Sequence, residues 1–205
     1  MPDRAALLKL AGHLKTPIAY FLYFGMVTLA LPLSLLRLWW RSRKAPAYIE
    51  RISERFGFIS IRPQPGGVWF HAVSVGEVLA IAPTIKKLLD ACPDIAVTLT
   101  TTTPTGSERV KALFGESVNH VYVPYDWPLC VFLFLQRVKP RLAVVVETEL
   151  WPVTLGICKH QGINILIANA RLSEKSANGY AKIRWLIAPA LKGITIAAQH
   201  EDDAK

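Results

Sequence analysis

Cysteine is scarce in this 205-residue sequence, and its three copies form no pattern. Cys92, Cys130 and Cys158 are an odd number, and no two of them have the C-x-x-C spacing of a metal or redox motif. These two observations argue against a disulfide framework and against a structural zinc site. We expect three small, largely buried thiols in a reducing compartment.

Metal-ligand spacing is also missing among the five histidines. Four of them are expected to be surface or packing residues: His13, His120, His160 and His200. His71 is less clear, because it lies in a predicted strand directly beneath a candidate site. We therefore predict no metal site.

Two glycine signatures are absent as well. Neither G-x-G-x-x-G nor G-x-x-x-x-G-K-[ST] occurs, which argues against a nucleotide-phosphate cradle in this chain. A dinucleotide-dependent reductase is therefore a poor interpretation.

Acidic residues are few, with 15 Asp and Glu against 24 Lys and Arg and a formal charge of +9. A basic chain favours acidic partners, and charge alone leaves nucleic acid, anionic lipid and a phosphorylated substrate open. Hydrophobic residues are abundant instead, at 52% of the chain.

Charge is absent from residues 17–36, a run of 20 residues. A helix rising 1.5 Å per residue would cover about 30 Å over this length, the thickness of a bilayer core. Tyr20 and Tyr23 lie near one end and Trp39 and Trp40 near the other, as in the aromatic belts of membrane proteins. We expect a membrane anchor, with a full span as the leading interpretation.

Three other interpretations of this run remain. A cleaved signal peptide is disfavoured, because the run is long and a basic cluster follows it. A helix lying in the membrane interface is the more serious alternative, since Pro32 could bend a span. A buried core helix is the third.

Basic residues flank the apolar run unequally. After the run come Arg37, Arg41, Arg43, Lys44, Arg51 and Arg55, against Glu50 and Glu54. Before it come Arg4, Lys9 and Lys15, against Asp3. The positive-inside rule then places the body of the protein in the cytoplasm, with the cationic stretch held against an anionic membrane surface. We expect residues 1–44 to form the anchor and its basic flank, and residues 45–205 to form a separate domain.

Short apolar, β-branched segments alternate with helix-length amphipathic segments after residue 67. Strands are predicted at 68–73, 95–101, 120–123, 142–146, 163–168 and 194–198, and helices at 77–89, 107–113, 129–138, 152–160 and 174–190. Strands that are apolar throughout are typical of a parallel sheet covered on both faces. The alternation predicts an α/β fold with a doubly wound, Rossmann-like sheet and right-handed crossovers.

Ligands of such a sheet bind beyond the carboxyl ends of its strands. After the first predicted strand, Ser74 and Gly76 form a turn and Glu77 falls in the first helical turn. The helix dipole favours an acid there, on a rigid element that a general base needs. On the pattern alone, an acid that only stabilises the helix start is the more frequent case.

Hydroxyl groups follow the second predicted strand. Thr103, Thr105 and Gly106 are candidates for contacts to a sugar or a phosphate, together with free N–H groups at the helix start. A β-branched strand end followed by a helix cap explains the same residues equally well.

Two carboxylates, Glu147 and Glu149, follow a fully apolar strand. Glu147 is nearest to the buried strand, where an ionised carboxylate is costly without a partner. It is the better candidate for a proton shuttle or a cation stabiliser. The alternative is one functional acid and one acid at a helix start.

Asn169 and Arg171 follow the next strand. The Arg171 guanidinium could bind an anion, or it could pair with Glu147 or Glu149 and hold that carboxylate charged. Both interpretations remain open.

These segments together resemble the Kdo transferase (3-deoxy-D-manno-octulosonic acid transferase) family over about residues 45–205. The resemblance is carried by WFHAVSVGEVLA, VTLTTTTPTGSERV, VYVPYDWP, VVVETELWP and ILIANARLSEKSANGY, which occur in the family's order and spacing. The apolar N-terminal anchor also matches.

The resemblance implies a GT-B glycosyltransferase that moves Kdo from CMP-Kdo to the lipid A precursor, with inversion, at the cytoplasmic face of the inner membrane. It assigns Glu77 as the base that accepts the proton of the acceptor hydroxyl. It assigns Glu147 to transition-state stabilisation, which suits a centre where positive charge develops. No cofactor beyond the donor substrate CMP-Kdo and no nucleic-acid partner are implied.

Chains of this family are about twice as long, with a donor-binding domain after the acceptor domain. The resemblance therefore implies that the domain binding CMP-Kdo is missing from these 205 residues. We expect this chain alone not to turn over. The alternative function is an inactive half that only binds the acceptor lipid.

Overall fold

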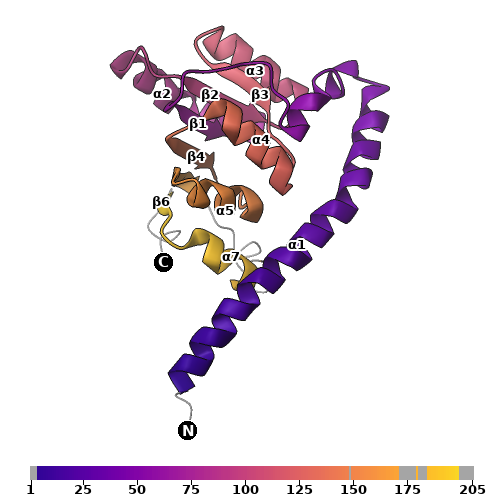
Figure 1. Ribbon diagram of the computed structural model, residues 1–205. Coiled ribbons are helices and arrows are strands. Elements are labelled where there is room, and N and C mark those ends of the chain that lie inside the picture. The colour runs from indigo at the N-terminus through magenta and orange to yellow at the C-terminus, as the bar shows by residue number, and fades with distance from the viewer. Residues whose placement is uncertain (1–3, 148, 171–178, 180–183, 199–205) are drawn as a thin grey trace.

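The computed structural model describes residues 4–147, 149–170, 179 and 184–198 (Figure 1). A long helix, α1 (Arg4–Ser42), leads through two short 3₁₀ helices, η1 (Pro46–Tyr48) and η2 (Ile52–Phe56), into the α/β body. The body contains β1 (Val68–His71), α2 (Val75–Ala91), β2 (Val97–Thr101), α3 (Pro104–Phe114), β3 (Asn119–Tyr122), α4 (Pro128–Val138), β4 (Leu142–Val146), α5 (Pro152–His160), β5 (Asn164–Ala170), α7 (Arg184–Leu191) and β6 (Thr195–Ala198).

The strands form one six-stranded sheet in the order β3-β2-β1-β4-β5-β6, and every pairing is parallel. This order confirms the predicted doubly wound, Rossmann-like sheet. The order reverses between β1 and β4, and a crevice at the carboxyl ends of the strands is expected at that point.

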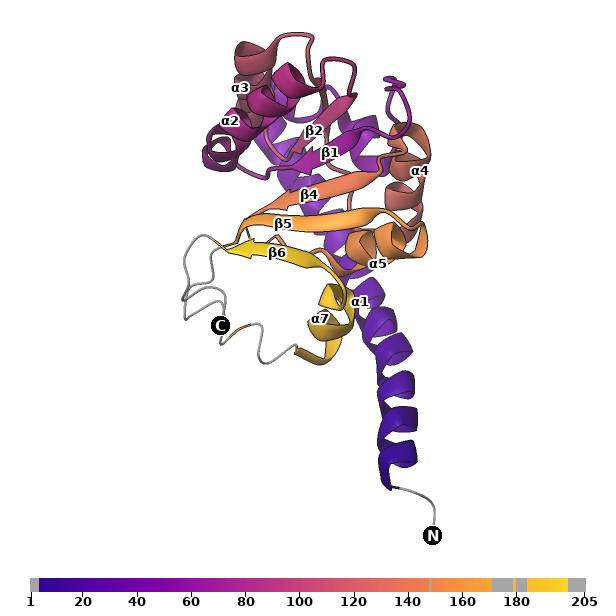
Figure 2. The same ribbon diagram turned by 90° about the vertical axis from the view of Figure 1, so that its left-hand side faces the viewer.

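Alternating side chains of each strand enter two separate cores. Trp69 of β1 packs with Phe134 of α4 on one face, whereas Phe70 packs with Val78 and Ile85 of α2 on the other. Figure 2 shows α2 and α3 on one side of the sheet and α4, α5 and α7 on the other. Burial on both faces explains why the strands are apolar throughout.

Helix caps set the boundaries of the helices. The Ser74 side chain caps α2 and the Thr103 side chain caps α3, so both helices begin earlier than predicted. Helices α4 and α5 begin at Pro128 and Pro152, in the first turn, where proline suits a helix. Most of the predicted helix 174–190 lies outside the described residues, and α7 covers its end.

Helix α1 is continuous through Pro32 and runs beside the body over its C-terminal half, while its N-terminal half projects beyond it (Figures 1 and 2). Its segment Phe21–Ser42 is long and apolar enough to cross a membrane. None of the apolar window in this segment is buried, so the buried-core-helix interpretation is wrong.

Polar contacts join α1 to the body at the start of α4 and α5. The Tyr23 hydroxyl donates to Asp126 Oδ2 at 2.6 Å, and Trp127 Nε1 donates to Thr28 Oγ1 at 3.1 Å. The buried Asp126 carboxylate also accepts the backbone N–H groups of Val153 and Thr154, the orphan donors at the start of α5. One carboxylate therefore connects α1 to a helix N-terminus.

Exposure differs from expectation at two kinds of residue. Cys92 is exposed, and only Cys130 and Cys158 are buried. Arg51 and Arg55 do not belong to the solvent-facing basic flank, because Arg55 is 5% exposed and Arg51 pairs with Glu54 at 2.8 Å. The exposed flank consists of Arg37, Arg41, Arg43 and Lys44.

Candidate functional site

The reversal of strand order brings two predicted catalytic acids to neighbouring strand ends. Glu77 lies in the first turn of α2, after β1, and Glu147 directly follows β4. Strands β1 and β4 are hydrogen-bonded neighbours with His71 opposite Val145. The candidate site is therefore at the carboxyl ends of the strands where the strand order reverses, which is where ligands of such sheets bind.

Glu77 is held in a capping box. Its carboxylate accepts the backbone N–H of Val73 at 2.8 Å and that of Ser74 at 3.1 Å, and Ser74 Oγ accepts the Glu77 N–H at 3.2 Å. Glu77 is 5% exposed. The helix-stabilising role that the sequence left open is therefore real. Each carboxylate oxygen accepts one amide and keeps lone pairs for a further donor.

Burial raises the pKa of Glu77, and the hydrogen bonds from Val73 and Ser74 lower it again. The negative charges of Glu149 and, to a smaller extent, Glu147 raise it further, and the net direction is upward. A carboxylate with a raised pKa is a stronger base, which suits proton abstraction from a hydroxyl group.

Glu147 and Asn169 both have a left-handed backbone. Glu147, after β4, has φ 59°, and Asn169, in β5, has φ 56°. The pairing register of β5 with β6 shifts at Asn169, between Ala168 and Ala170. The two positions are adjacent, because the Glu147 N–H donates to the Ala168 carbonyl at 2.9 Å. Asparagine adopts this conformation more readily than glutamate, so the backbone at Glu147 is strained.

Trp151 contacts the end of β1. Trp151 packs edge-to-face on His71, with ring centroids 5.3 Å apart, and its Nε1 donates to Glu149 Oε2 at 3.0 Å. Glu149 lies close enough to Glu77 for its negative charge to raise the pKa of Glu77. His71 itself is buried, and burial lowers its pKa to about 4. It is a neutral packing residue beneath the site.

The predicted threonine segment adjoins the Glu77 loop. Thr102 Oγ1 donates to the Val73 carbonyl at 2.8 Å, which ties the β2–α3 loop to the β1–α2 loop. Thr103 caps α3, and its hydroxyl lies 3.1 Å from that of the exposed Thr105. Gly106 is buried, and a Cβ there would lie 3.0 Å from Thr101 Cβ. Close packing against β2 therefore explains this glycine.

The structure thus brings most of the predicted site residues together at one edge of the sheet. Their roles in binding stay predictions: Ser74, Gly76, Thr103, Thr105, Gly106, Glu149 and Asn169. Ser74 and Gly76 are exposed beside the buried Glu77. Arg171 lies outside the described residues.

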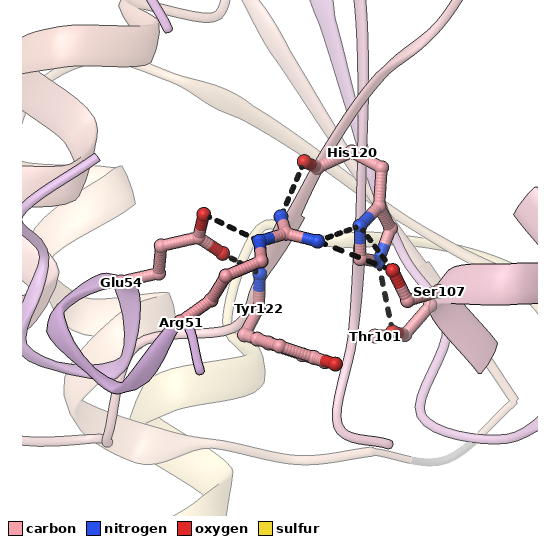
Figure 3. A network of polar contacts seen from close by, with 6 residues as sticks. All are labelled: Arg51, Glu54, Thr101, Ser107, His120 and Tyr122. Atoms are coloured by element: carbon pink, nitrogen blue, oxygen red, sulfur yellow. Dashed lines mark hydrogen bonds and ion pairs between the residues drawn. The ribbon is translucent and has the colours of Figure 1, made fainter. Parts of the chain in front are cut away.

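A polar network that lies next to the threonine segment was not predicted from the sequence (Figure 3). Arg51 donates to the His120 carbonyl at 2.8 Å and contacts His120 Nδ1 at 3.2 Å, while His120 Nε2 contacts Thr101 Oγ1 at 2.9 Å. Glu54 accepts the Tyr122 N–H at 2.8 Å. Because arginine only donates, Nδ1 of His120 accepts and Nε2 carries the proton.

This network fixes η2 against β3 and the end of β2. The i, i+3 spacing of Arg51 and Glu54 is the one signal that could have indicated it in the sequence. His120, expected to be a surface or packing residue, is half-buried and packs within it.

Known proteins share these motifs. A model of the family described as 3-Deoxy-D-manno-octulosonic-acid transferase (kdotransferase) matches residues 50–205. The 3-deoxy-D-manno-octulosonic acid transferase of Haemophilus influenzae is 45% identical over 166 residues, covering 80% of this chain and 39% of the relative. That of Bordetella pertussis is 34% identical over 193 residues, covering 87% of this chain and 45% of the relative.

A plant protein is similar as well. The probable mitochondrial 3-deoxy-D-manno-octulosonic acid transferase of Arabidopsis thaliana is 35% identical over 158 residues, covering 77% of this chain and 35% of the relative. The matched segments thus cover less than half of the length of these curated relatives. On the match of the family model over residues 50–205 and on these identities, the chain belongs to the 3-deoxy-D-manno-octulosonic acid transferase family.

Proposed function

We propose that this chain is the acceptor-side part of a glycosyltransferase that transfers Kdo from CMP-Kdo to the lipid A precursor in lipopolysaccharide biosynthesis. The observation that carries the proposal is the position of Glu77. Its carboxylate is fixed by two backbone N–H groups at the reversal point of the sheet, and its pKa is raised.

In the proposed reaction, Glu77 accepts the proton of the acceptor sugar hydroxyl through a lone pair that the capping box leaves free. The hydroxyl oxygen forms a bond to the anomeric carbon of Kdo while the bond from that carbon to the CMP phosphate breaks. Attack on the face opposite to the leaving group inverts the centre. Positive charge develops on the sugar in the transition state, and the Glu147 carboxylate would stabilise it.

A fusion tests this proposal, with residues 1–205 replacing the matching part of the H. influenzae relative. We expect it to transfer labelled Kdo from CMP-Kdo to the lipid A precursor. Glu77→Gln keeps one oxygen that can accept a backbone N–H and removes the basic carboxylate, so transfer should fall by about 10²-fold or more. Ile85→Val, which shortens a buried side chain of the same helix away from the candidate site, controls for stability. Transfer by Glu77→Gln at the rate of the unchanged fusion would refute the assignment.

The pH profile gives a second measure of the base. Activity requires the ionised Glu77 carboxylate, so kcat/KM should rise with pH through its raised pKa. Glu149→Gln removes a negative charge that raises this pKa, and should move the acid limb of the profile to lower pH.

The isolated 205-residue chain provides the third arm. We expect it to bind the acceptor lipid without donor and not to transfer Kdo. Transfer by this chain alone would overturn the assignment of the donor site to a separate domain.

For location, we propose that the chain lies on the cytoplasmic face of the inner membrane with α1 in the plane of the bilayer surface. The body contacts α1 at Tyr23 and again around Arg41, which lines a cavity with Arg55 and Tyr125. These two contacts are about 27 Å apart along the helix axis. An upright span would therefore carry the body into the hydrocarbon core.

The side chains of α1 divide accordingly. Its outer face exposes large apolar groups at alternating spacings of four and three: Leu22, Met26, Leu29, Leu33, Leu36 and Trp40. This spacing produces one apolar stripe along a helix. Basic residues follow at its end, as is typical of a helix in the membrane interface. The interface alternative is therefore preferred here to the full span.

A further inference from the structure

A cavity of about 300 Å³ lies between the end of α1 and the carboxyl end of β2. Its volume is at the lower end of the range of small-ligand sites. The residues that matter in its lining are Arg37 and Arg41 of α1, Arg55 of η2, Thr102 and Thr103 after β2, and Tyr125.

Positive charge in this cavity is not balanced by its lining. Three arginines line it, and no carboxylate does so among the residues that the structure describes. Glu54, the acid next to Arg55 in sequence, is engaged by Arg51 instead. A guanidinium in a weakly solvated site attracts an anion strongly when no acid neutralises it.

Two buried polar groups in the lining lack partners. Arg55 is only 5% exposed, and its Nη2 donates to the Thr102 carbonyl at 2.8 Å. Its Nε, like the Tyr125 hydroxyl, has no hydrogen-bond partner within the described part of the chain. Buried donors normally have partners. Burial also lowers the pKa of Arg55, a cost that a bound anion would offset.

The cavity adjoins both the candidate site and the proposed membrane surface. Thr102 ties it to the Glu77 loop through Val73, and Arg37 and Arg41 belong to the helix that exposes the apolar stripe. An anion in the cavity would therefore be held next to the loop that carries Glu77, the proposed base, at the depth of lipid head groups.

We propose that this cavity binds a phosphate monoester, with Arg37, Arg41 and Arg55 as its cationic partners and the Thr103 hydroxyl as a further donor. Arginine and hydroxyl groups donate to phosphate oxygens. A phosphate monoester has more free acceptor oxygens and more negative charge than a diester, so this lining favours the monoester. The proposal deepens the proposed function, since such a group on a membrane-bound acceptor would position the sugar hydroxyl near Glu77.

Calorimetry on the full chain in a neutral detergent tests the site. The detergent covers the apolar stripe of α1, so binding of the lipid tails to that stripe does not dominate the measurement. The ligands are short-chain phosphatidic acid, which is a monoester, short-chain phosphatidylglycerol, which is a diester, and inorganic phosphate. We expect phosphatidic acid to bind about tenfold more tightly than phosphatidylglycerol. Arg37→Gln and Arg41→Gln, at exposed positions that should not affect folding, should each remove most of this preference.

Arg43→Gln is the matched control. Arg43 stacks on Trp39 at 4.0 Å much as Arg41 stacks on Tyr48 at 4.3 Å, and it is exposed on the same basic flank without lining the cavity. Its loss should weaken binding of both lipids equally and leave the preference unchanged. Inorganic phosphate that binds, and loses binding in Arg41→Gln, shows a site for phosphate from either source. Binding of phosphatidic acid alone shows that the lipid must deliver it.

Equal binding of monoester and diester by the unchanged chain would overturn the proposal, as would a preference that survives both Arg37→Gln and Arg41→Gln. Kdo transfer plays no part in this measurement. Failure of the phosphate site therefore stays distinguishable from failure of Glu77 as the base.

Discussion

The left-handed backbone at Glu147 allows strain and function to be separated at a single residue. A non-glycine residue in this conformation costs about 1–2 kcal/mol, and glycine avoids the cost. We predict that Glu147→Gly is about 1 kcal/mol more stable than Glu147→Ala in urea denaturation. Both variants should lose most transfer activity in the fusion, because both lack the carboxylate.

A Glu147→Gly variant that is less stable than Glu147→Ala would show that a residue with a side chain carries no strain at this backbone position. Full activity in either variant would remove Glu147 from the mechanism. The two measurements are independent of each other.

The lowered pKa values of two buried or half-buried histidines make the stability of the protein depend on pH. Burial, and to a smaller extent the Arg51 charge, lower the pKa of His120 to about 3, and burial lowers that of His71 to about 4. The unfolded chain therefore binds more protons than the folded protein between these values and about 6.5. Stability should fall with decreasing pH in this window, by roughly 1.4 kcal/mol per pH unit for each histidine.

His120→Gln removes one of these titrations and should lower the slope by roughly 1.4 kcal/mol per pH unit between pH 6 and 4, whatever the buried carboxyl groups contribute to the total. Urea denaturation at several pH values measures the slope separately from the absolute stability, which the substitution also lowers. An unchanged slope would mean that His120 is protonated in the folded protein, opposite the Arg51 guanidinium.

At the level of elements, two glycines with nearly the same φ differ in what surrounds them. Gly57, at φ 83°, ends η2, and a Cβ there would lie 2.3 Å from the Cys130 carbonyl of α4. Gly66, at φ 82°, has no heavy atom within 4 Å of its Cβ position among the described atoms. We predict that Gly66→Ala costs about 1 kcal/mol and Gly57→Ala at least about 3 kcal/mol.

The difference between these two variants measures the close approach of η2 to α4, because both carry the same backbone strain. Thermal denaturation of the two proteins provides it. Equal costs would mean that η2 moves away from α4 without a penalty.

Helix starts illustrate how far elements could be predicted. The apolar run LAVVV predicted β4, and Pro152 predicted the start of α5, both with the observed bounds. Ser74 and Thr103 are candidate site residues, and the sequence left a helix cap open for the threonine segment; both side chains are caps, so α2 and α3 begin earlier than predicted. Caps and ligand-binding loops use the same small hydroxyl residues, and only the tertiary structure separates the two uses.

At the level of the whole molecule, the position of α1 predicts a depth profile. Spin labels placed singly at positions 22, 29 and 36, after Cys92→Ala removes the exposed thiol, should lie at similar shallow depths in vesicles. An upright span would instead place position 29 near the bilayer centre. Position 31, whose side chain is partly covered, provides a comparison on the other face. A deep maximum at position 29 would contradict the in-plane arrangement.

The sequence by itself determined the parallel α/β sheet, the long apolar helix near the N-terminus and the strand ends that carry Glu77 and Glu147, because these follow from local periodicity and short motifs. Tertiary structure decided the rest. It turned Arg51 and Arg55 inward, laid α1 along the body and placed three arginines around one cavity with no described acid in its lining. These outcomes depend on contacts between residues far apart in the chain, such as Tyr23 with Asp126, whose energies no local pattern encodes.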